Sequence, residues 1–285
     1  MTQRVGLIGK PLRRRHSQVM HDAAFDAAGI DARYVLLELE PEEVEAAVAA
    51  ARGEDWLGLG VTAPYKRVVA GLCDDIDPEA ARIGAVNNVA RTPAGGLVGF
   101  NTDAPGFRAG VELAMGRSLH GSTVVVAGAG GAAHAVVFAC LDAGARHVTI
   151  GNRTVSAAAA LAERFGDIGP GTVQAVALGD PAFERALRSA DVAVNATTVG
   201  MVDPGTTIDV ALLPVTATVF DLVYVPPETP LLRAARAHGL RAANGSEMLI
   251  AQAAIAFERW TGVGGMADVM RSAVAPLLAD PAATA

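Results

Sequence analysis

The sequence predicts an α/β fold with two domains, and three observations lead to that expectation. Short runs rich in Val, Ile and Leu alternate with longer stretches in which apolar residues recur every three or four positions. One apolar run is followed directly by a glycine-rich turn and then by an Ala-rich stretch, which is the order strand, turn, helix. The length of 285 residues suits about two domains rather than one. Regular alternation of strand and helix is typical of parallel sheets that helices cover on both faces.

Composition and charge exclude several classes of protein. The net charge of −7 leaves no surplus of positive charge for nucleic acid or for an anionic membrane surface, so neither partner is expected. With 51% hydrophobic and 19% charged residues, the chain has the composition of a globular protein. Cys73 and Cys140 lack the paired spacing of a disulfide framework or a zinc site, which favours a reducing cytoplasm. His16 and His21 have no third ligand at suitable spacing, so no metal is expected.

Residues 1–102 are expected to form the first domain. Periodicity predicts, in chain order, a strand at 5–8, a helix at 17–28, strands at 34–39 and 56–61, and a helical stretch at 79–83. Pro41, Glu42 and Glu43 predict the start of a further helix, because proline is harmless at the first helical position and acidic residues favour the first turn. Apolar runs at 86–90 and 97–100 flank a glycine-containing turn and predict a β-hairpin.

Residues 103–244 are expected to form a second, doubly wound domain. The expected elements are a helix at 103–115, strand 124–127, helix 132–143, strand 148–150, helix 155–165 and strands near 173–177, 192–196 and 219–223. Residues 124–141 are almost free of polar side chains, yet the glycines in their middle break the helix that a membrane span requires. In residues 245–285, amphipathic stretches at 248–260 and 266–278 predict two helices that could fold back on either domain.

The turn after strand 124–127 is typical of a phosphate-binding site. It matches the pattern G-x-G-x-x-A and contains Gly128, Ala129, Gly130, Gly131 and Ala132. Glycines let the backbone approach a pyrophosphate closely, and the N–H groups that begin the next helix favour its negative charge. The position that selects the cofactor, after the second strand, holds Asn152, Arg153 and Thr154 and no carboxylate. An arginine beside a hydroxyl suits the 2′-phosphate of NADP, so NADP is the expected cofactor.

Lys66 is a candidate acid/base because this sequence otherwise uses arginine. The chain has 21 arginines and only two lysines, Lys10 and Lys66. Guanidinium stays protonated, whereas a lysine can donate and recover a proton. Lys66 also follows a predicted parallel strand, at the end where open α/β sheets bind their ligands. The alternative is that Lys66 is a solvated surface lysine.

Several motifs together resemble the shikimate dehydrogenase family, in order and over nearly the whole chain. Residues 61–66 read Val-Thr-Ala-Pro-Tyr-Lys, residues 84–87 read Gly-Ala-Val-Asn and residues 101–103 read Asn-Thr-Asp. The glycine turn, Asn152-Arg153-Thr154, Asn195-Ala196-Thr197 and residues 251–254 follow at family-like spacing. The resemblance implies a substrate-binding domain at 1–102, a Rossmann NADP domain at 103–244, and helices at 245–285 that return to the first domain.

The resemblance also implies residue roles in a reversible hydride transfer between NADPH and 3-dehydroshikimate, a step of aromatic amino acid biosynthesis by the shikimate pathway. Lys66 and Asp103 would be the catalytic pair, although Asp103 could equally cap the helix at 103–115. Leu222 and Gly245 would border the nicotinamide. The substrate, a cyclic hydroxy acid, would contact Ser17, Thr62, Asn87, Tyr224 and Gln252.

Two departures from the family pattern keep alternatives open. The family usually has two serines, in the pattern S-x-S-P, that bind the substrate carboxylate; here Arg15 takes the place of the first and Gln18 that of the proline. Arg15 could bind the carboxylate bidentately or redirect the enzyme to quinate, an aminoshikimate-type compound or another cyclohexane carboxylic acid. Ala157 stands where relatives often carry a second basic residue. A non-catalytic NADP-binding regulator is the alternative from another class, and a homodimer is one option for the assembly.

Overall fold

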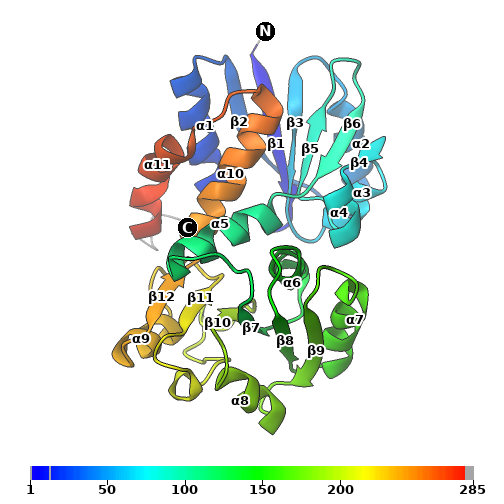
Figure 1. Cartoon of the computed structure of the whole chain (residues 1–285). Helices are drawn as coiled ribbons and strands as arrows, with labels where there is room; N and C mark the ends of the chain where they lie inside the picture. The colour runs from blue at the N-terminus through cyan, green and yellow to red at the C-terminus, as the bar shows by residue number, and fades with distance from the viewer. Residues whose placement is uncertain (1, 13, 280–285) are drawn as a thin grey trace. The chain divides into compact units, whose positions relative to one another are not determined.

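A computed structural model describes residues 2–12 and 14–279 and divides the chain into two compact units (Figure 1). The first unit contains residues 1–102 and 250–285, and the second contains residues 103–249. Each unit is built around one six-stranded sheet, which confirms the α/β fold class. The boundary near the C-terminus falls at 249/250, five residues later than the sequence suggested, inside a continuous helix.

The sheet of the first unit is mixed. Its strands lie in the order β2-β1-β3-β5-β6-β4. Their bounds are β1 (Gln3–Gly9), β2 (Ala32–Glu38), β3 (Trp56–Val61), β4 (Asp75–Ile76), β5 (Asn88–Arg91) and β6 (Leu97–Phe100). Strands β1, β2 and β3 are parallel, and β5 and β6 form the predicted antiparallel hairpin. The hairpin begins at Asn88 rather than at 86, so Val86 and Asn87 stay in the turn that leads into it.

Helices cover both faces of this sheet. They are α1 (His16–Ala28), the 3₁₀ turn η1 (Pro41–Glu43), α2 (Val44–Ala50), α3 (Lys66–Ala70), α4 (Pro78–Ile83), the larger part of α10 (Ser246–Thr261), and α11 (Ala267–Ala279). The helix expected to open at Pro41 begins instead with a 3₁₀ turn, which Glu40 and Glu43 cap reciprocally. Helix α1 ends at Gly29, whose positive φ of 66° closes the last turn.

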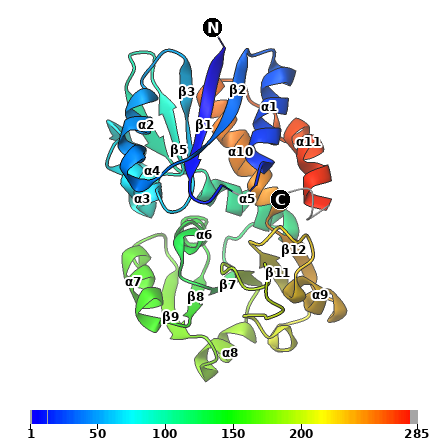
Figure 2. The same ribbon diagram turned by 180° about the vertical axis from the view of Figure 1, so that it is seen from behind.

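Two glycines in β3 make room for aromatic side chains, Trp260 of α10 and Tyr34 of β2. A Cβ at Gly58 would lie 2.6 Å from Nε1 of Trp260, and a Cβ at Gly60 would lie 2.6 Å from the hydroxyl of Tyr34. Leu59 points to the opposite face and packs in the core that contains α2. Both views accordingly show α10 and α2 on opposite faces of the first sheet (Figures 1 and 2). Trp260 also donates a hydrogen bond from Nε1 to the carbonyl oxygen of Val89, at 2.9 Å.

The sheet of the second unit is parallel throughout. Its strands lie in the order β12-β11-β10-β7-β8-β9. Their bounds are β7 (Thr123–Ala127), β8 (His147–Asn152), β9 (Thr172–Ala177), β10 (Val192–Asn195), β11 (Thr218–Asp221) and β12 (Arg241–Asn244). The chain runs outward from β7 to β9 and then from β10 to β12 in the other direction. The change of direction lies between β7 and β10, where doubly wound sheets bind ligands at the carboxyl ends of the strands.

Helices also cover both faces of the second sheet. They are α5 (Asp103–Met115), α6 (Gly131–Asp142), α7 (Val155–Phe165), α8 (Pro181–Leu187), the 3₁₀ turn η2 (Val210–Leu212) and α9 (Pro230–Ala237). Val219 of β11 packs with α8 and α9, whereas its neighbour Phe220 makes an edge contact with Phe107 of α5, with ring centroids 5.6 Å apart. Among the residues that the structure describes, no helix combines the length and the hydropathy of a membrane span.

Candidate functional site

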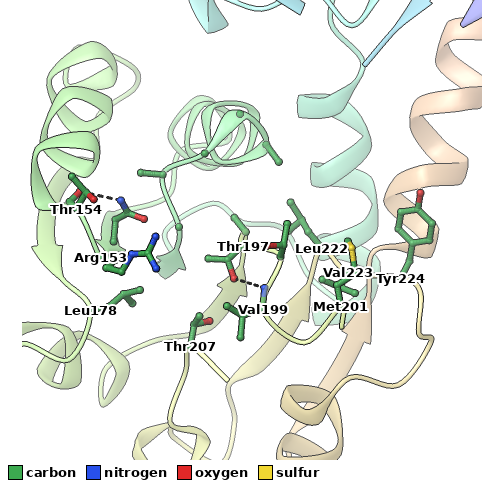
Figure 3. A pocket seen from close by; sticks show the side chains of 18 residues that line it. Arg153, Thr154, Leu178, Thr197, Val199, Met201, Thr207, Leu222, Val223 and Tyr224 are labelled. Carbon is green, nitrogen blue, oxygen red and sulfur yellow. Dashed lines mark hydrogen bonds between the residues drawn. The ribbon is translucent and has the colours of Figure 1, made fainter. Parts of the chain in front are cut away.

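A cavity of about 610 Å³ opens at the carboxyl ends of the second sheet (Figure 3). Its walls come from the turn after β7, the end of β8 and the loops that follow β9, β10 and β11. The lining residues are Gly128, Ala129, Gly130, Gly131, Ala132, Asn152, Arg153, Thr154, Leu178, Ala196, Thr197, Thr198, Val199, Met201, Thr207, Leu222, Val223 and Tyr224. The cavity therefore lies where the change of strand direction predicts a ligand site.

Backbone geometry requires a glycine at the first position of the turn. Gly128 has a φ of 114°, and a Cβ there would lie 2.9 Å from the carbonyl oxygen of Ala196. Gly130 occupies the N-cap of α6, and a Cβ on Gly130 or Gly131 would meet no atom within 4 Å. The start of α6 thus presents bare backbone to the cavity. Helix N-termini of this kind accept phosphate groups because their N–H groups and the helix dipole favour negative charge.

The positive charge in the lining of the cavity lies at one end, on Arg153. Arg153 is the only charged residue among those that line the cavity, and it lies beside Thr154 at the end of β8 (Figure 3). The side-chain amide of Asn152 donates to the carbonyl oxygen of Thr154 at 2.9 Å and so fixes this turn. Ala157, one turn into α7, is exposed and adds no cation. A guanidinium without a neighbouring carboxylate can bind a phosphate monoester bidentately.

The other end of the cavity is formed by the loops after β10 and β11. Met201, Leu222, Val223 and Tyr224 lie here, away from Arg153 (Figure 3). Gly245 is not among the lining residues. It packs against the backbone of Leu222, because a Cβ at Gly245 would lie only 2.4 Å from the Leu222 carbonyl oxygen.

The structure therefore gathers nearly all of the residues that the sequence marked for the cofactor, together with several that it did not. All of them except Gly245 line the cavity, and Tyr224, which was expected to contact substrate, lines it too. The lining residues to which the sequence analysis assigned no role are Leu178, Ala196, Thr197, Thr198, Val199, Met201, Thr207 and Val223. Their shared signal is position, since most of them directly follow the ends of β9, β10 and β11.

In the first unit, backbone hydrogen bonds bring three of the predicted residues together. The N–H of Val61, next to Thr62, donates to the carbonyl oxygen of Asn87 at 2.7 Å. The N–H of Val86 donates to the carbonyl oxygen of Lys66 at 3.1 Å. Lys66 is the first residue of α3 and is half-buried. Thr62, Lys66 and Asn87 thus share the end of β3, although they lie up to 25 positions apart in the chain.

Asn87 also organises the segment that leads to Asp103. Its Oδ1 accepts from the N–H of Thr102 and from Nδ2 of Asn88, both at 2.8 Å, and its Nδ2 donates to Oγ1 of Thr102 at 3.1 Å. Only 6% of Asn87 and 1% of Thr102 are exposed. Asp103 follows as the first residue of α5, where the helix dipole favours a carboxylate.

The N-terminal departures form a connected pair. Arg15 occupies the N-cap of α1, and its Nε donates to Oε1 of Gln18 at 2.9 Å. Nε2 of Gln18 in turn donates to the carbonyl oxygen of Tyr34 at 3.1 Å, which anchors the pair to β2. A guanidinium whose Nε is held in this way keeps the two Nη groups, with four N–H donors, on its far side. Ser17 is half-buried in the first turn of the same helix.

Gln252 belongs to α10. It is half-buried and lies eight residues before Trp260, with Ala256 midway between them. Spacing of four residues places all three on one face of the helix, the face that Trp260 packs against the first sheet.

Comparisons with known proteins identify what this chain is similar to. Three family models match it: the shikimate dehydrogenase substrate binding domain over residues 7–89, shikimate / quinate 5-dehydrogenase over residues 111–201, and the shikimate 5′-dehydrogenase C-terminal domain over residues 245–275. The shikimate dehydrogenase (NADP(+)) of Methanopyrus kandleri is 41% identical over 276 residues, which cover 96% of this chain and 95% of the relative.

Two solved structures extend the likeness to the fold. Shikimate 5-dehydrogenase from Listeria monocytogenes, in complex with shikimate and NAD, has a TM-score of 0.90 at 30% identity, with 95% of this chain and 96% of that chain covered. Shikimate 5-dehydrogenase from Thermus thermophilus, in complex with NADP(H) and shikimate, has a TM-score of 0.84 at 36% identity, with 96% of this chain and 99% of that chain covered.

Proposed function

This chain belongs to the shikimate dehydrogenase family, and we propose that it interconverts shikimate and 3-dehydroshikimate with NADP as the hydride carrier. One observation in the molecule carries the proposal beyond family membership: among the described residues that line the dinucleotide cavity, Arg153 alone is charged. An acidic residue at this place would accept from the 2′-hydroxyl of NAD, whereas a lone guanidinium favours the 2′-phosphate of NADP. The enzyme is thus an NADP-dependent oxidoreductase.

The residues of the second unit fit the cofactor in a defined direction. The bare backbone of the turn from Gly128 to Ala132 would hold the pyrophosphate, and Arg153 with Thr154 would hold the adenosine 2′-phosphate. The nicotinamide would then lie toward the loops after β10 and β11, next to Leu222. When bound, the reduced cofactor supplies the hydride.

Lys66 would supply the proton. As a hydride reaches the carbonyl carbon of 3-dehydroshikimate, negative charge grows on the oxygen, and an ammonium stabilises that charge before donating its proton. In the direction of oxidation, the neutral amine recovers the proton from the hydroxyl. We assign Asp103 the task of orienting the Lys66 ammonium and a ring hydroxyl, a role compatible with its place at the start of α5.

The substrate carboxylate would be bound by Arg15 and Ser17. Gln18 orients the guanidinium, so that both Nη groups can donate to the two carboxylate oxygens in parallel. The ring hydroxyls would be recognised by the neutral side chains of Thr62, Asn87, Tyr224 and Gln252, since each can accept and donate.

Initial rates test this function directly. Shikimate with NADP⁺ should be oxidised with a higher kcat/KM than shikimate with NAD⁺, and quinate or an aminated analogue should be slower. Preference for quinate or the aminated compound would retain the enzyme class and overturn the substrate. NADP⁺ binding without turnover of any of the three compounds would instead favour a regulator.

We also propose a location and an assembly for the enzyme. Cys73 and Cys140 are free thiols, as expected in a reducing compartment, and we place the enzyme in the cytoplasm. A homodimer is the assembly to test first, because paired identical subunits are the commonest oligomers. Light scattering of the purified chain gives the answer as twice the 29.1 kDa monomer mass or as the monomer mass itself.

A further inference from the structure

Two polar residues end adjacent strands beneath the dinucleotide cavity. Asn195 is the last residue of β10 and Asp221 the last of β11, and they are direct partners in the parallel ladder. Asn195 is 1% exposed and Asp221 is 0% exposed. Nδ2 of Asn195 donates to Oδ1 of Asp221 at 2.8 Å. Neither residue lines the cavity, and the function proposed above assigns no role to either.

The carboxyl group of Asp221 is fully buried and accepts hydrogen bonds from protein groups around it. Besides Asn195, its Oδ1 accepts from the N–H of Val223 at 3.1 Å, and its Oδ2 accepts from Oγ1 of Thr229 at 2.6 Å. Thr229 is the N-cap of α9. Burial raises the pKa of Asp221, and the hydrogen bonds from Thr229, Val223 and Asn195 oppose that rise. A buried carboxylate is costly without such donors, so these contacts determine how the β11 loop leaves the sheet.

Asp221 also determines which way the amide of Asn195 points. A carboxylate only accepts hydrogen bonds, so the NH₂ group of Asn195 must face it and Oδ1 must face away. On that side, Oδ1 accepts from Oγ1 of Thr197 at 2.7 Å, from the N–H of Thr197 at 3.2 Å and from Oγ1 of Thr207 at 3.1 Å. If the amide of Asn195 were flipped, its NH₂ group would face the N–H of Thr197. Both groups are donors, so neither would have an acceptor.

The loop after β10 is therefore tied to one side chain at both of its ends. At the start of the loop, Asn195 is hydrogen-bonded to Thr197 and also donates from Nδ2 to the carbonyl oxygen of Val199 at 3.1 Å. Farther along the loop, Oγ1 of Thr207 donates to Oδ1 of the same asparagine. Met201 lies between Val199 and Thr207 in the sequence, and it lines the cavity near Leu222 and Val223 (Figure 3). Val223, tied to Asp221, lines the cavity from the neighbouring loop.

We infer that Asn195 and Asp221 form a positioning pair that shapes the nicotinamide end of the site and leaves the adenosine end to Arg153. The inference rests on the proposed function, because it uses the direction in which the dinucleotide would lie. It predicts that damage to the pair weakens binding of the whole dinucleotide but not binding of its adenosine half. A defect in general stability would weaken both alike.

The test compares two ligands of the intact enzyme by calorimetry. Adenosine 2′,5′-bisphosphate contains the 2′-phosphate but no nicotinamide, whereas NADPH contains both. In Asp221→Asn, the amide of Asn195 is no longer forced into one orientation. We expect the Kd for NADPH to rise about tenfold, the effect of lost hydrogen bonds to a charged group, and the Kd for the bisphosphate to change less than about twofold.

The matched control lies at the opposite end of β10, the strand that ends with Asn195. Asp191 precedes β10 and accepts from the N–H of Thr123 at 2.8 Å and from Nη2 of Arg117 at 2.7 Å. Asp191→Asn should lower the unfolding temperature while leaving both Kd values unchanged. Parallel weakening of both ligands in Asp221→Asn, or no weakening of either, would overturn the positioning role. Absence of NADPH binding in the wild-type enzyme would instead refute the proposed function.

A milder pair of variants keeps the test decisive if Asp221→Asn does not fold. Thr207→Val removes the hydrogen bond from Oγ1 of Thr207 to Asn195 and keeps the buried pair of Asn195 and Asp221. Thr207→Ser retains the hydroxyl that makes this hydrogen bond. We expect Thr207→Val to raise the Kd for NADPH about threefold with the bisphosphate unaffected, and Thr207→Ser to behave as wild type. Equal behaviour of the Val and Ser variants would mean that the hydroxyl tie has no role in positioning.

Discussion

Oδ1 of Asn87 accepts the N–H of Thr102 at 2.8 Å, one residue before Asp103 enters α5. This contact joins the turn ahead of β5 to the segment that carries a proposed catalytic carboxylate. Asn87 therefore has a structural role besides the substrate contact proposed for it, because its side chain satisfies a buried backbone donor.

Asn87→Ala should lower both stability and turnover. The variant leaves the Thr102 N–H without its acceptor, which costs about 1–3 kcal/mol in the free energy of unfolding. Release of the segment before Asp103 should also lower kcat. Asn88→Ala is the matched control. It removes the hydrogen bonds from Asn88 to the side chains of Asn87 and Thr102, but the Thr102 N–H keeps its acceptor. Urea unfolding and initial rates measure both effects, and an equal loss of kcat in the two variants would contradict a special role for Asn87.

Lys66→Ala should lower kcat by about 10²-fold or more, as expected when a general acid is lost. The Kd for NADPH should stay near the wild-type value, because Lys66 lies in the first unit and the dinucleotide cavity lies in the second. Arg67→Ala provides the control, since Arg67 is the next residue of α3, is also cationic and is exposed. Near-normal turnover in Lys66→Ala would remove lysine from the mechanism.

The fold was predictable from local patterns where those patterns are long. Strand β3 and helices α5 and α7 begin and end at the expected residues, because apolar periodicity and capping signals mark them strongly. The strand, glycine turn and helix at 124–141 are confirmed as β7 and α6. Gly128, Gly130 and Gly131 interrupt an apolar stretch that would otherwise resemble a membrane span, and this is the local signal that separates β7 from α6.

Short elements and long-range partners were not predictable. Strand β12 has the sequence Arg-Ala-Ala-Asn, without a β-branched residue, and it is a strand because β11 offers it a parallel edge. Helices α8 and α9 have only seven and eight residues. The partnership of Asn195 and Asp221 spans 26 positions and depends on strand register, which single-sequence patterns do not encode.

Arg153→Ala should reduce the preference for NADP⁺ over NAD⁺ selectively. The loss of a charge-assisted pair of hydrogen bonds to the 2′-phosphate should lower kcat/KM with NADP⁺ about 10- to 100-fold, while kcat/KM with NAD⁺ changes little. Arg188→Ala is a suitable control, because Arg188 is an exposed arginine at the C-cap of α8 and does not line the cavity. Equal rates with both cofactors in the wild-type enzyme would refute selection by Arg153.

Arg15 and Gln18 should act together on the KM for shikimate. Arg15→Ala removes a bidentate partner of the carboxylate and should raise this KM at least about tenfold, and Arg15→Lys should restore little because an ammonium lacks the planar fork. Gln18→Ala leaves the charge but frees the guanidinium, so a smaller rise is expected. If Arg15→Ala leaves the KM unchanged, the carboxylate is bound elsewhere, with Ser17 as the next residue to replace.

His21 should make the enzyme less stable in mild acid. Burial lowers its pKa from 6.5 to about 3, and its ring stacks on Tyr34 with centroids 4.6 Å apart and lies near Trp260 and Phe257. Nδ1 has no hydrogen-bond partner among the described residues. The unfolded chain therefore takes up a proton below pH 6.5 while the folded chain stays neutral, so the free energy of unfolding falls as pH drops from 6.5 toward 3.

The size of this effect follows from the linkage of proton uptake to unfolding. The loss approaches about 1.4 kcal/mol per pH unit, or about 2 kcal/mol between pH 6.5 and pH 5. His21→Phe keeps an aromatic ring against Tyr34 and removes the titration. Urea unfolding of both proteins at pH 7 and pH 5 isolates the contribution of His21 as the difference between their two losses. Equal losses in wild type and variant would place the acid sensitivity in another group, because only His21 distinguishes the two chains.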